Sequence, residues 1–136
     1  MDADLARAFL HSHHRAVLAT TRADGRPQLS PVVCAVGADG RVLISTRETA
    51  IKIKNLRREP HAALCVFTDG FFGEWVQIEG TAEIVTLPAA LDLLVAYYRQ
   101  ISGEHPDWDD YRAAMIRDQR VIVRITITRA GPDVSG

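Results

Sequence analysis

The sequence has little cysteine, and its two thiols show no pattern of a disulfide, a metal site or a redox pair. Cys34 and Cys65 each lie inside an apolar run, without a CxxC spacing and without clustered histidines. We therefore expect two buried free thiols. No apolar run approaches the ~20 residues of a membrane-spanning helix, and the acidic start of the chain is unlike a signal peptide. These absences predict a cytoplasmic protein that is neither secreted nor inserted into a membrane.

The sequence also lacks the common motifs of hydrolases, metalloenzymes and nucleotide-binding folds. No GxSxG elbow surrounds Ser30, Ser45 or Ser102, and the five histidines include no HExxH pair. Neither GxGxxG nor GxxxxGK(S/T) occurs, which excludes a Rossmann or P-loop phosphate site as far as motifs can exclude one. We expect no metal, and any cofactor must be held in another way.

Charge and length set further limits. The formal net charge of −1 and the aromatic content of 7% give no sign of general nucleic-acid binding. At 136 residues the chain is long enough for one hydrophobic core but too short for two. We expect one domain over residues 1–130 and a flexible tail over residues 131–136.

Hydrophobic periodicity and turn residues divide the chain into short strands and helices. Asp-Gly pairs at residues 24–25 and 39–40 are typical of tight hairpins between successive strands. Residues 51–54 alternate like a strand, but the following Pro60 favours a short helix over residues 49–58. The expected strands are residues 16–21, 28–36, 42–46, 62–68, 75–85 and 121–128, and the expected helices are residues 5–12 with Asp4 as the cap, 49–58, 88–101 and 107–117.

The short links between the early strands imply a mainly antiparallel sheet. Such a sheet escapes exposed edges by curling into a barrel. The expected fold class is therefore α+β, mainly β, with a six-stranded antiparallel barrel and short flanking helices.

A cluster of positive side chains follows the expected strand that ends at Ser45 and Thr46. Amides at a helix N-terminus, hydroxyls and a lysine together bind phosphate, because the helix dipole and the unpaired N–H groups favour negative charge. The pattern points to a nucleotide-like cofactor, although charge alone also fits the solvated face of a surface helix. The cluster consists of Lys52, Lys54, Arg57 and Arg58.

Aromatic residues bracket the turn before the fifth expected strand. Phe71, Phe72 and Trp75 would either wall a planar ring or fill a dimer interface. Gln77 alternates with Trp75, and its amide suits the edge of a flavin or a solvated strand face. Acidic residues around Trp108 are expected to cap the final helix rather than to act as an acid and base pair: Glu104, Asp107, Asp109 and Asp110.

Several stretches, taken in order, form a specific combination. The two most specific stretches are NLRREP from Asn55 and GEHPDWDDYR from Gly103. The others consist mainly of Asp-Gly hairpins and β-branched strands, which are common in proteins. This order resembles the pyridoxamine 5′-phosphate oxidase-like, FMN-binding split-barrel superfamily, and within it the actinobacterial branch that uses the deazaflavin coenzyme F-420. The resemblance spans nearly the whole chain. The other stretches that carry it are AVLATTRADGRPQLSPV from Ala16, VLIST from Val42, KIKNLRREPHAAL from Lys52 and WVQIEGTAEI from Trp75.

The resemblance implies a homodimer of split β-barrels, with one cofactor in each of two grooves formed by both subunits. Lys52 would meet the cofactor phosphate, and Arg57 and Arg58 would attract the acidic tail of F-420 more loosely. The other residues implied at the cofactor are Ser45 and Thr46 along the groove, the backbone of Ser30, Pro31 and Val32 at the ring, and Trp75 and Gln77 from the following strand.

The resemblance also implies an activity, with no catalytic residue assigned. Reduced F-420 would transfer a hydride to a conjugated small organic substrate while the protein positions the ring. FMN-using relatives often carry an arginine just before the lysine, whereas Ala50 and Ile51 stand here, which favours F-420 over FMN. Without the long C-terminal extension of true pyridoxamine phosphate oxidases, vitamin B6 oxidation is not expected. The alternatives are an FMN-binding oxidase or flavin reductase, a non-catalytic carrier of F-420 or a haem-like ligand, and a structural dimer without a ligand.

Overall fold

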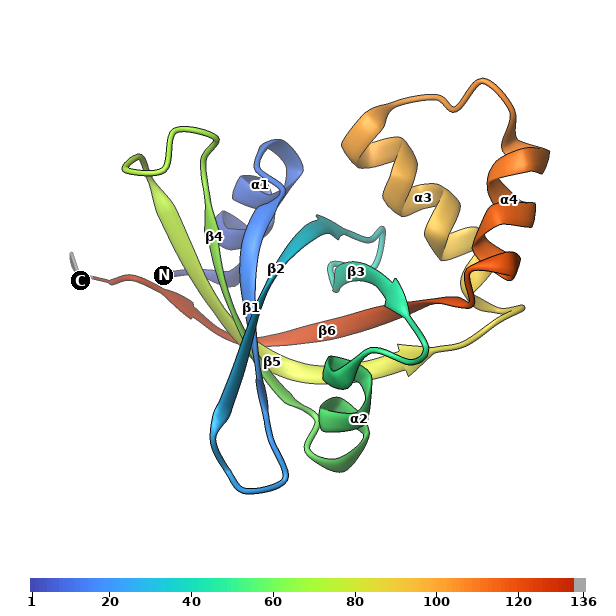
Figure 1. The fold of residues 1–136 in the computed structure, drawn as a ribbon. Coiled ribbons are helices and arrows are strands. Elements are labelled where there is room, and N and C mark those ends of the chain that lie inside the picture. Colours follow the sequence, from blue (N-terminus) through green and yellow to red (C-terminus); the bar gives the residue numbers. More distant parts are fainter. Residues whose placement is uncertain (134–136) are drawn as a thin grey trace.

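The computed structural model describes residues 1–133, which form a closed barrel with helices around it (Figure 1). In this part of the chain, six strands pair antiparallel in the order β1-β2-β3-β6-β5-β4, and β4 closes onto β1. The predicted α+β barrel is confirmed. The strands are β1 (Arg15–Thr21), β2 (Pro27–Val36), β3 (Val42–Arg47), β4 (His61–Phe67), β5 (Trp75–Val85) and β6 (Arg120–Gly131), and the helices are α1 (Ala3–Ser12), α2 (Ile51–Arg58), α3 (Ala90–Ser102) and α4 (Trp108–Arg117).

The observed elements lie close to the predicted ones, and two differences have a clear physical cause. Asp2 caps α1, and the prediction of Asp4 is wrong: the Asp2 carboxylate accepts a hydrogen bond from the Asp4 N–H at 2.7 Å. β6 continues to Gly131 because its second half pairs with β5. Residues 134–136 of the predicted tail lie outside the described residues. No helix within residues 1–133 combines the length and the apolar character needed to cross a bilayer.

Two hairpins with the same turn chemistry connect β1, β2 and β3, as predicted. Gly25 and Gly40 have φ angles of 87° and 82°, in the left-handed region that glycine adopts without a Cβ clash. The carboxylates of Asp24 and Asp39 accept hydrogen bonds from the N–H two residues further on, at 3.1 and 3.0 Å. Each turn is therefore stabilised within its own few residues.

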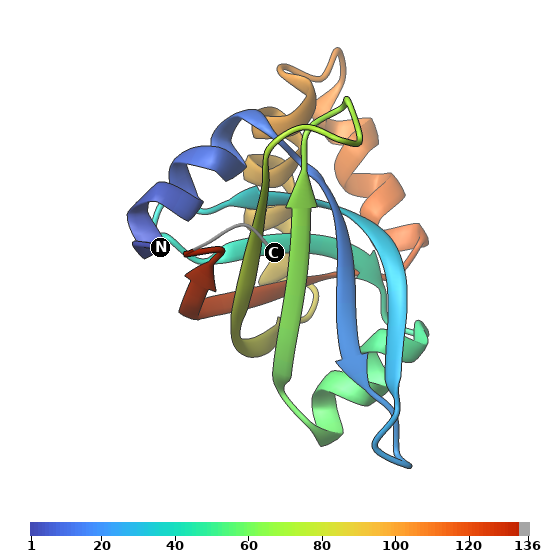
Figure 2. The same cartoon turned by 90° about the vertical axis from the view of Figure 1, so that its left-hand side faces the viewer.

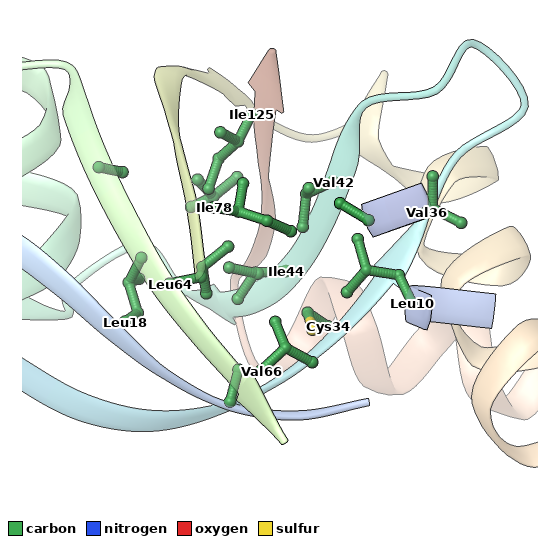
Figure 3. Packing of buried hydrophobic residues seen from close by; sticks show 14 of the residues in the cluster. Leu10, Leu18, Cys34, Val36, Val42, Ile44, Leu64, Val66, Ile78 and Ile125 are labelled. Carbon is green, nitrogen blue, oxygen red and sulfur yellow. The ribbon is translucent and has the colours of Figure 1, made fainter. Parts of the chain in front are cut away.

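Side chains that point inward from the strands fill the barrel (Figure 3). Leu18, Ile44, Leu64 and Ile78 are fully or almost fully buried in this core, and Leu10 of α1 packs against one end of it. Burial of each such side chain contributes roughly 1.5–3 kcal/mol. The core therefore supplies the main stabilisation of the barrel.

The two cysteines lie in different environments. Cys34 is in the core, as predicted, and burial raises the pKa of its thiol to about 12. Cys65 is exposed on the outside of β4, so the prediction that it is buried is wrong for the single chain. Side chains alternate along a strand, and the neighbours Leu64 and Val66 point into the barrel, which leaves Cys65 outside.

Helices α3 and α4 form a second, smaller core against the outside of β3 and β6. Leu43 and Ile122 point away from the barrel interior and pack with Leu94 of α3. Gln100 fastens α3 to the end of β2, because its amide accepts a hydrogen bond from the Val36 N–H at 2.8 Å and donates to the Val36 carbonyl at 2.7 Å. The helix pair is thus held in place by both apolar and polar contacts.

A polar network fastens α2 to β1. The buried Asn55 donates a hydrogen bond to Thr20 Oγ1 at 3.1 Å. Arg58 donates to Asn55 Oδ1 at 3.0 Å and to the Thr21 carbonyl at 2.7 Å. Two residues of the NLRREP stretch therefore have structural partners, and these hold α2 against the end of β1.

The outside of β2, β1 and β4 carries mostly apolar side chains, and no helix stands in front of it in Figure 2. Arg15 lies on the same face, and beside it β5 adds Trp75 but also the polar Gln77 and Glu79. The strand register aligns the side chains of this surface in rows, for example Leu29, Ala19 and Ala63, and Leu29 is 62% exposed. We term this surface the outer face. It consists of Leu29, Pro31, Val33, Val17, Ala19, Ala63, Cys65, Phe67 and Trp75.

Gly80 lies at a bulge where β5 and β6 approach too closely for a side chain. A Cβ at this position would clash with the Thr126 carbonyl oxygen and would lie 2.7 Å from Ile125 Cγ2. We expect Gly80→Ala to lower the free energy of unfolding by about 1–3 kcal/mol, the usual effect of overpacking, as measured by urea denaturation. Gly70→Ala is the control, because its Cβ would meet nothing within 4 Å. An unchanged stability of Gly80→Ala would contradict the close approach.

Candidate functional site

A cleft of about 830 Å³ opens where β3 ends and β6 begins, between the barrel and the helices α3 and α4. Sites for small molecules commonly have volumes of about 300–1,000 Å³. The side chains that line the cleft include cations, hydroxyls and aromatic rings, but no carboxylate. They are Arg15, Ala16, Pro31, Val32, Val33, Ser45, Thr46, Lys52, Phe67, Tyr97, Tyr98, Tyr111, Met115 and Arg120.

Lys52 and Arg120 are the central cations of this cleft. Burial lowers the pKa of Lys52, and the positive charge of Arg120 lowers it further. Arg120 also lies directly opposite Arg47 in the β3–β6 ladder, an arrangement of like charges that is destabilising. Within residues 1–133, no carboxylate forms an ion pair with any of these three side chains. The arrangement is suited to a bound anion, which would offset the repulsion.

Hydroxyl and amide donors lie beside these cations. Ser45 and the buried Thr46 stand near the end of β3 and line the cleft with Lys52. Lys52 is in the first turn of α2, whose N-cap residue, Ala50, has no side chain that can accept a hydrogen bond from the first amides. A helix start of this kind leaves N–H groups for an anion.

Tyrosines of α3 and α4 form the opposite wall. The Tyr97 hydroxyl donates a hydrogen bond to the Val33 carbonyl at 2.9 Å, and burial raises the pKa of Tyr97 to about 12. The Tyr111 hydroxyl donates to the Leu94 carbonyl at 2.8 Å, and burial raises its pKa as well. Both phenols are therefore neutral structural groups at physiological pH. Tyr98 presents a third aromatic ring to the cleft.

The GEHPDWDDYR stretch builds the support for this aromatic wall. Trp108, His105 and Tyr111 surround Tyr98 with ring centroids 5.0–5.7 Å away. Asp107 caps α4 by accepting a hydrogen bond from the Asp110 N–H at 3.1 Å, as the sequence predicted for this acidic segment. The stretch therefore orients the helix pair and does not contribute an acid and base pair to the cleft.

The structure brings five of the predicted cofactor residues together. Lys52, Ser45, Thr46, Pro31 and Val32 all line the same cleft.

Ser30, Trp75 and Gln77 lie outside this lining. Ser30 is opposite the core residue Leu18, so its side chain is on the inner side of β2, where its Oγ is buried without a hydrogen-bond partner among the described residues. Trp75 and Gln77 line another hollow with residues 129–133. Any contact of these three residues with a cofactor stays a prediction.

Arg57 and Arg58 have partners within the chain. Arg57 forms an ion pair with Glu48, and Arg58 takes part in the hydrogen bonds that fasten α2 to β1. Neither lines the cleft. Their role toward an acidic cofactor tail therefore stays a prediction.

Sequence reasoning missed several lining residues, above all Arg120. Arg120 is distant from Lys52 in the chain and reaches the cleft only through the pairing of β6 with β3. The tyrosines at 97 and 98 were placed on a helix, but their direction depends on how α3 docks. Within residues 1–133, no group of three His, Cys, Asp or Glu side chains is arranged to hold a metal ion.

The closed barrel and its cationic cleft define a split-barrel protein with a site suited to an anionic small molecule. A sequence profile of the pyridoxamine 5′-phosphate oxidase family matches residues 3–131. The chain therefore belongs to this family, whose members typically bind a flavin.

Solved structures share this fold over almost the whole chain. A conserved hypothetical protein from Mycobacterium tuberculosis is 28% identical, with a TM-score of 0.78, and the match covers 100% of this chain and 92% of that one. A protein described as an F-420 reductase is 21% identical, with a TM-score of 0.71 and coverage of 92% and 94%. A haem storage protein from Vibrio cholerae is 15% identical, with a TM-score of 0.71 and coverage of 94% and 92%. The last two similarities concern the fold alone.

The lowered pKa of Lys52 means that the folded chain disfavours its positive charge. This penalty is fully present below the lowered pKa of the folded chain and is lost as the pH rises from that pKa to the ordinary lysine pKa of 10.5. We expect Lys52→Gln to raise the free energy of unfolding of the ligand-free protein at neutral pH by up to about 0.5 kcal/mol. Solvent screening keeps the effect small.

Urea denaturation at two salt concentrations measures this effect. The gain in stability should be larger at about 0.01 M salt than at about 1 M salt, because the Debye length is ~30 Å at the lower concentration and ~3 Å at the higher one. Lys54→Gln, an exposed position on the same helix, is the control and should show no such gain. A loss of stability in Lys52→Gln would contradict the proposed repulsion.

Proposed function

We propose that this chain is a homodimeric oxidoreductase that binds coenzyme F-420 in the cleft and reduces a conjugated small organic substrate. The observation that carries the proposal is the pair of unneutralised cations, Lys52 and Arg120, in a cleft without a carboxylate. A phosphate-bearing cofactor supplies the missing negative charge, and the aromatic wall of α3 and α4 suits its planar ring.

The residues of the cleft fit such a cofactor by their chemistry and by their arrangement. Lys52 and Arg120 would hold the phosphate, with the hydroxyls of Ser45 and Thr46 as further donors. Val32 and the neighbouring β2 backbone would support the ring from the barrel side. When bound in its reduced form, F-420 supplies a hydride, so the chain's own residues need only bind, orient and exclude water.

The outer face supports the dimeric part of the proposal. Val33 and Phe67 belong to this face and also line the cleft, so a second copy packed on the face would stand beside the cleft. Contiguous exposed apolar surfaces commonly mark protein–protein interfaces. A homodimer would also cover Leu29 and Cys65.

FMN is the second candidate cofactor, because members of the family typically bind a flavin. Ile51 stands directly before Lys52, where FMN-using relatives often have an arginine, so the start of α2 supplies one cation and not two. This difference favours F-420 over FMN. Arg120 offers a cation from another element, which serves either cofactor.

Titration of the purified protein with F-420, followed by fluorescence, tests the cofactor site. We expect Lys52→Ala and Arg120→Gln each to weaken binding by about 1.5–3 kcal/mol, the scale of a hydrogen bond to a charged group. FMN should bind at least about tenfold more weakly than F-420, a difference of about 1.4 kcal/mol. Tighter binding of FMN would transfer the protein to the flavin-using class.

Two controls separate the phosphate contact from general damage to the site. Lys54→Ala removes an exposed charge of the same helix and should leave F-420 affinity unchanged. Riboflavin, which lacks the phosphate of FMN, should bind the wild type and Lys52→Ala equally. An equal loss of riboflavin and F-420 binding in Lys52→Ala would disprove a phosphate role for this lysine.

Sedimentation analysis of a charged variant tests the dimer. We expect Leu29→Glu to sediment as a monomer where the wild type is a dimer, because an unpaired carboxylate buried in an apolar interface costs several kcal/mol. Ile116→Glu is the matched control, since Ile116 is 54% exposed on α4, away from the outer face. A dimer that persists in Leu29→Glu would place the interface elsewhere.

A further inference from the structure

The barrel splits between β2 and β3, and the split lies at the cationic cleft. The two strands pair over three positions, and the pair nearest the cleft is Cys34 opposite Ile44. Beyond this pair, within residues 1–133, β2 pairs with β1 alone and β3 with β6 alone. Val33 and Ser45 come next along the two strands, and both line the cleft.

The directions of the backbone groups show which hydrogen bond is missing at the split. Neighbouring residues of a strand point their N–H and C=O groups to opposite sides. The Cys34 N–H donates to the carbonyl of His14, just before β1, at 2.8 Å, so the backbone groups of Val33 point toward β3. In a continued ladder, the Val33 carbonyl would accept a hydrogen bond from the Ser45 N–H. The strands diverge instead, and both groups need another partner.

The Tyr97 hydroxyl is the partner of both groups. It donates a hydrogen bond to the Val33 carbonyl at 2.9 Å. Burial raises the pKa of Tyr97 to about 12, and a hydrogen bond from the Ser45 backbone to the phenol oxygen acts in the opposite direction. The hydroxyl therefore keeps its proton at physiological pH and stands where a ladder hydrogen bond between β2 and β3 would lie.

Tyr97 belongs to α3, and other contacts fix this helix against the barrel. Leu94 of α3 packs with Leu43 of β3 in the smaller core. Gln100, about one turn beyond Tyr97, binds both backbone groups of Val36, at the end of the ladder remote from the cleft. Helix α3 therefore contacts β2 at both ends of its ladder with β3, through Tyr97 beside the cleft and through Gln100 at the other end.

We propose that Tyr97 is a positioning residue whose hydroxyl holds β2 and β3 at a fixed spacing, and with them the two sides of the cofactor site. The part that concerns a cofactor rests on the proposed function, in which the β2 backbone beside Val32 supports the ring and Ser45 of β3 donates to the phosphate. A hydroxyl bonded to both strands fixes one contact relative to the other. A site for a rigid ligand needs such support, because small displacements of its contacts weaken binding.

Tyr97→Phe tests the spacing in the ligand-free protein. The phenyl ring still separates the strands, but the Ser45 N–H loses its partner. We expect hydrogen exchange of the Ser45 amide, measured by NMR relative to Leu43 of the same strand, to become roughly three- to tenfold faster. Gln100→Met is the matched control, because it removes the hydrogen bonds of α3 to Val36 and should leave this ratio unchanged. An unchanged ratio in Tyr97→Phe overturns the inference.

Titration with F-420 and with FMN, followed by fluorescence, tests the effect on the cleft. We expect Tyr97→Phe to bind the cofactor that the wild type prefers roughly three- to tenfold more weakly, the scale of one lost hydrogen bond. Gln100→Met should keep the affinity of the wild type. An equal loss in both variants overturns the positioning role, because the cause would then be a general loosening of α3.

The positioning role and the proposed function fail in different ways. Weaker cofactor binding in Lys52→Ala together with unchanged binding in Tyr97→Phe supports the phosphate site and overturns the positioning role. A wild type that binds neither F-420 nor FMN overturns the proposed function. The exchange ratio of Ser45 then still decides whether Tyr97 spaces the strands, because that measurement needs no cofactor.

Discussion

The pairing of β3 with β6 is the constraint on which the rest of the structure depends. Residues 42–47 align with residues 120–125, and this ladder closes the barrel after α3 and α4 have been inserted between β5 and β6. Closure satisfies the backbone groups that an open sheet would leave at its edges. The same pairing brings Arg120 to the end of β3, where Ser45 and Lys52 stand. The cationic cleft is thus a product of barrel closure.

Stability and binding make opposite demands at this cleft. The buried apolar cluster inside the barrel supplies stability that offsets the repulsion between cations at its rim. The helix pair α3 and α4 adds a rigid aromatic wall, because the side chains around Tyr98 fill the space between the helices. The distinctive GEHPDWDDYR stretch acts through this packing. This stretch orients the aromatic wall of the cleft, whereas the positive charge of the cleft comes from other elements.

Much of the fold was predictable because it depends on local chemistry. The Asp-Gly turns, the alternating strands and the short helix at residues 51–58 follow from neighbours in the chain, and the structure has them near the expected positions. Lys52, Ser45 and Thr46 were predictable members of one site, because a strand end and the next helix start are adjacent in sequence. The family resemblance rests on the same local stretches.

The sequence by itself determined the kinds of elements and their order, since hydrophobic period and turn chemistry act over a few residues. It also determined the polar character of the cleft residues that are close together in the chain, Ser45, Thr46 and Lys52. Only the tertiary structure decided that Arg120 joins Lys52, that Arg58 is bound to β1 and that Cys65 faces outward. Each of these depends on register or docking between segments far apart in the chain. A one-residue change of register reverses which side chains face the core, and short-range patterns do not specify such long-range alignments.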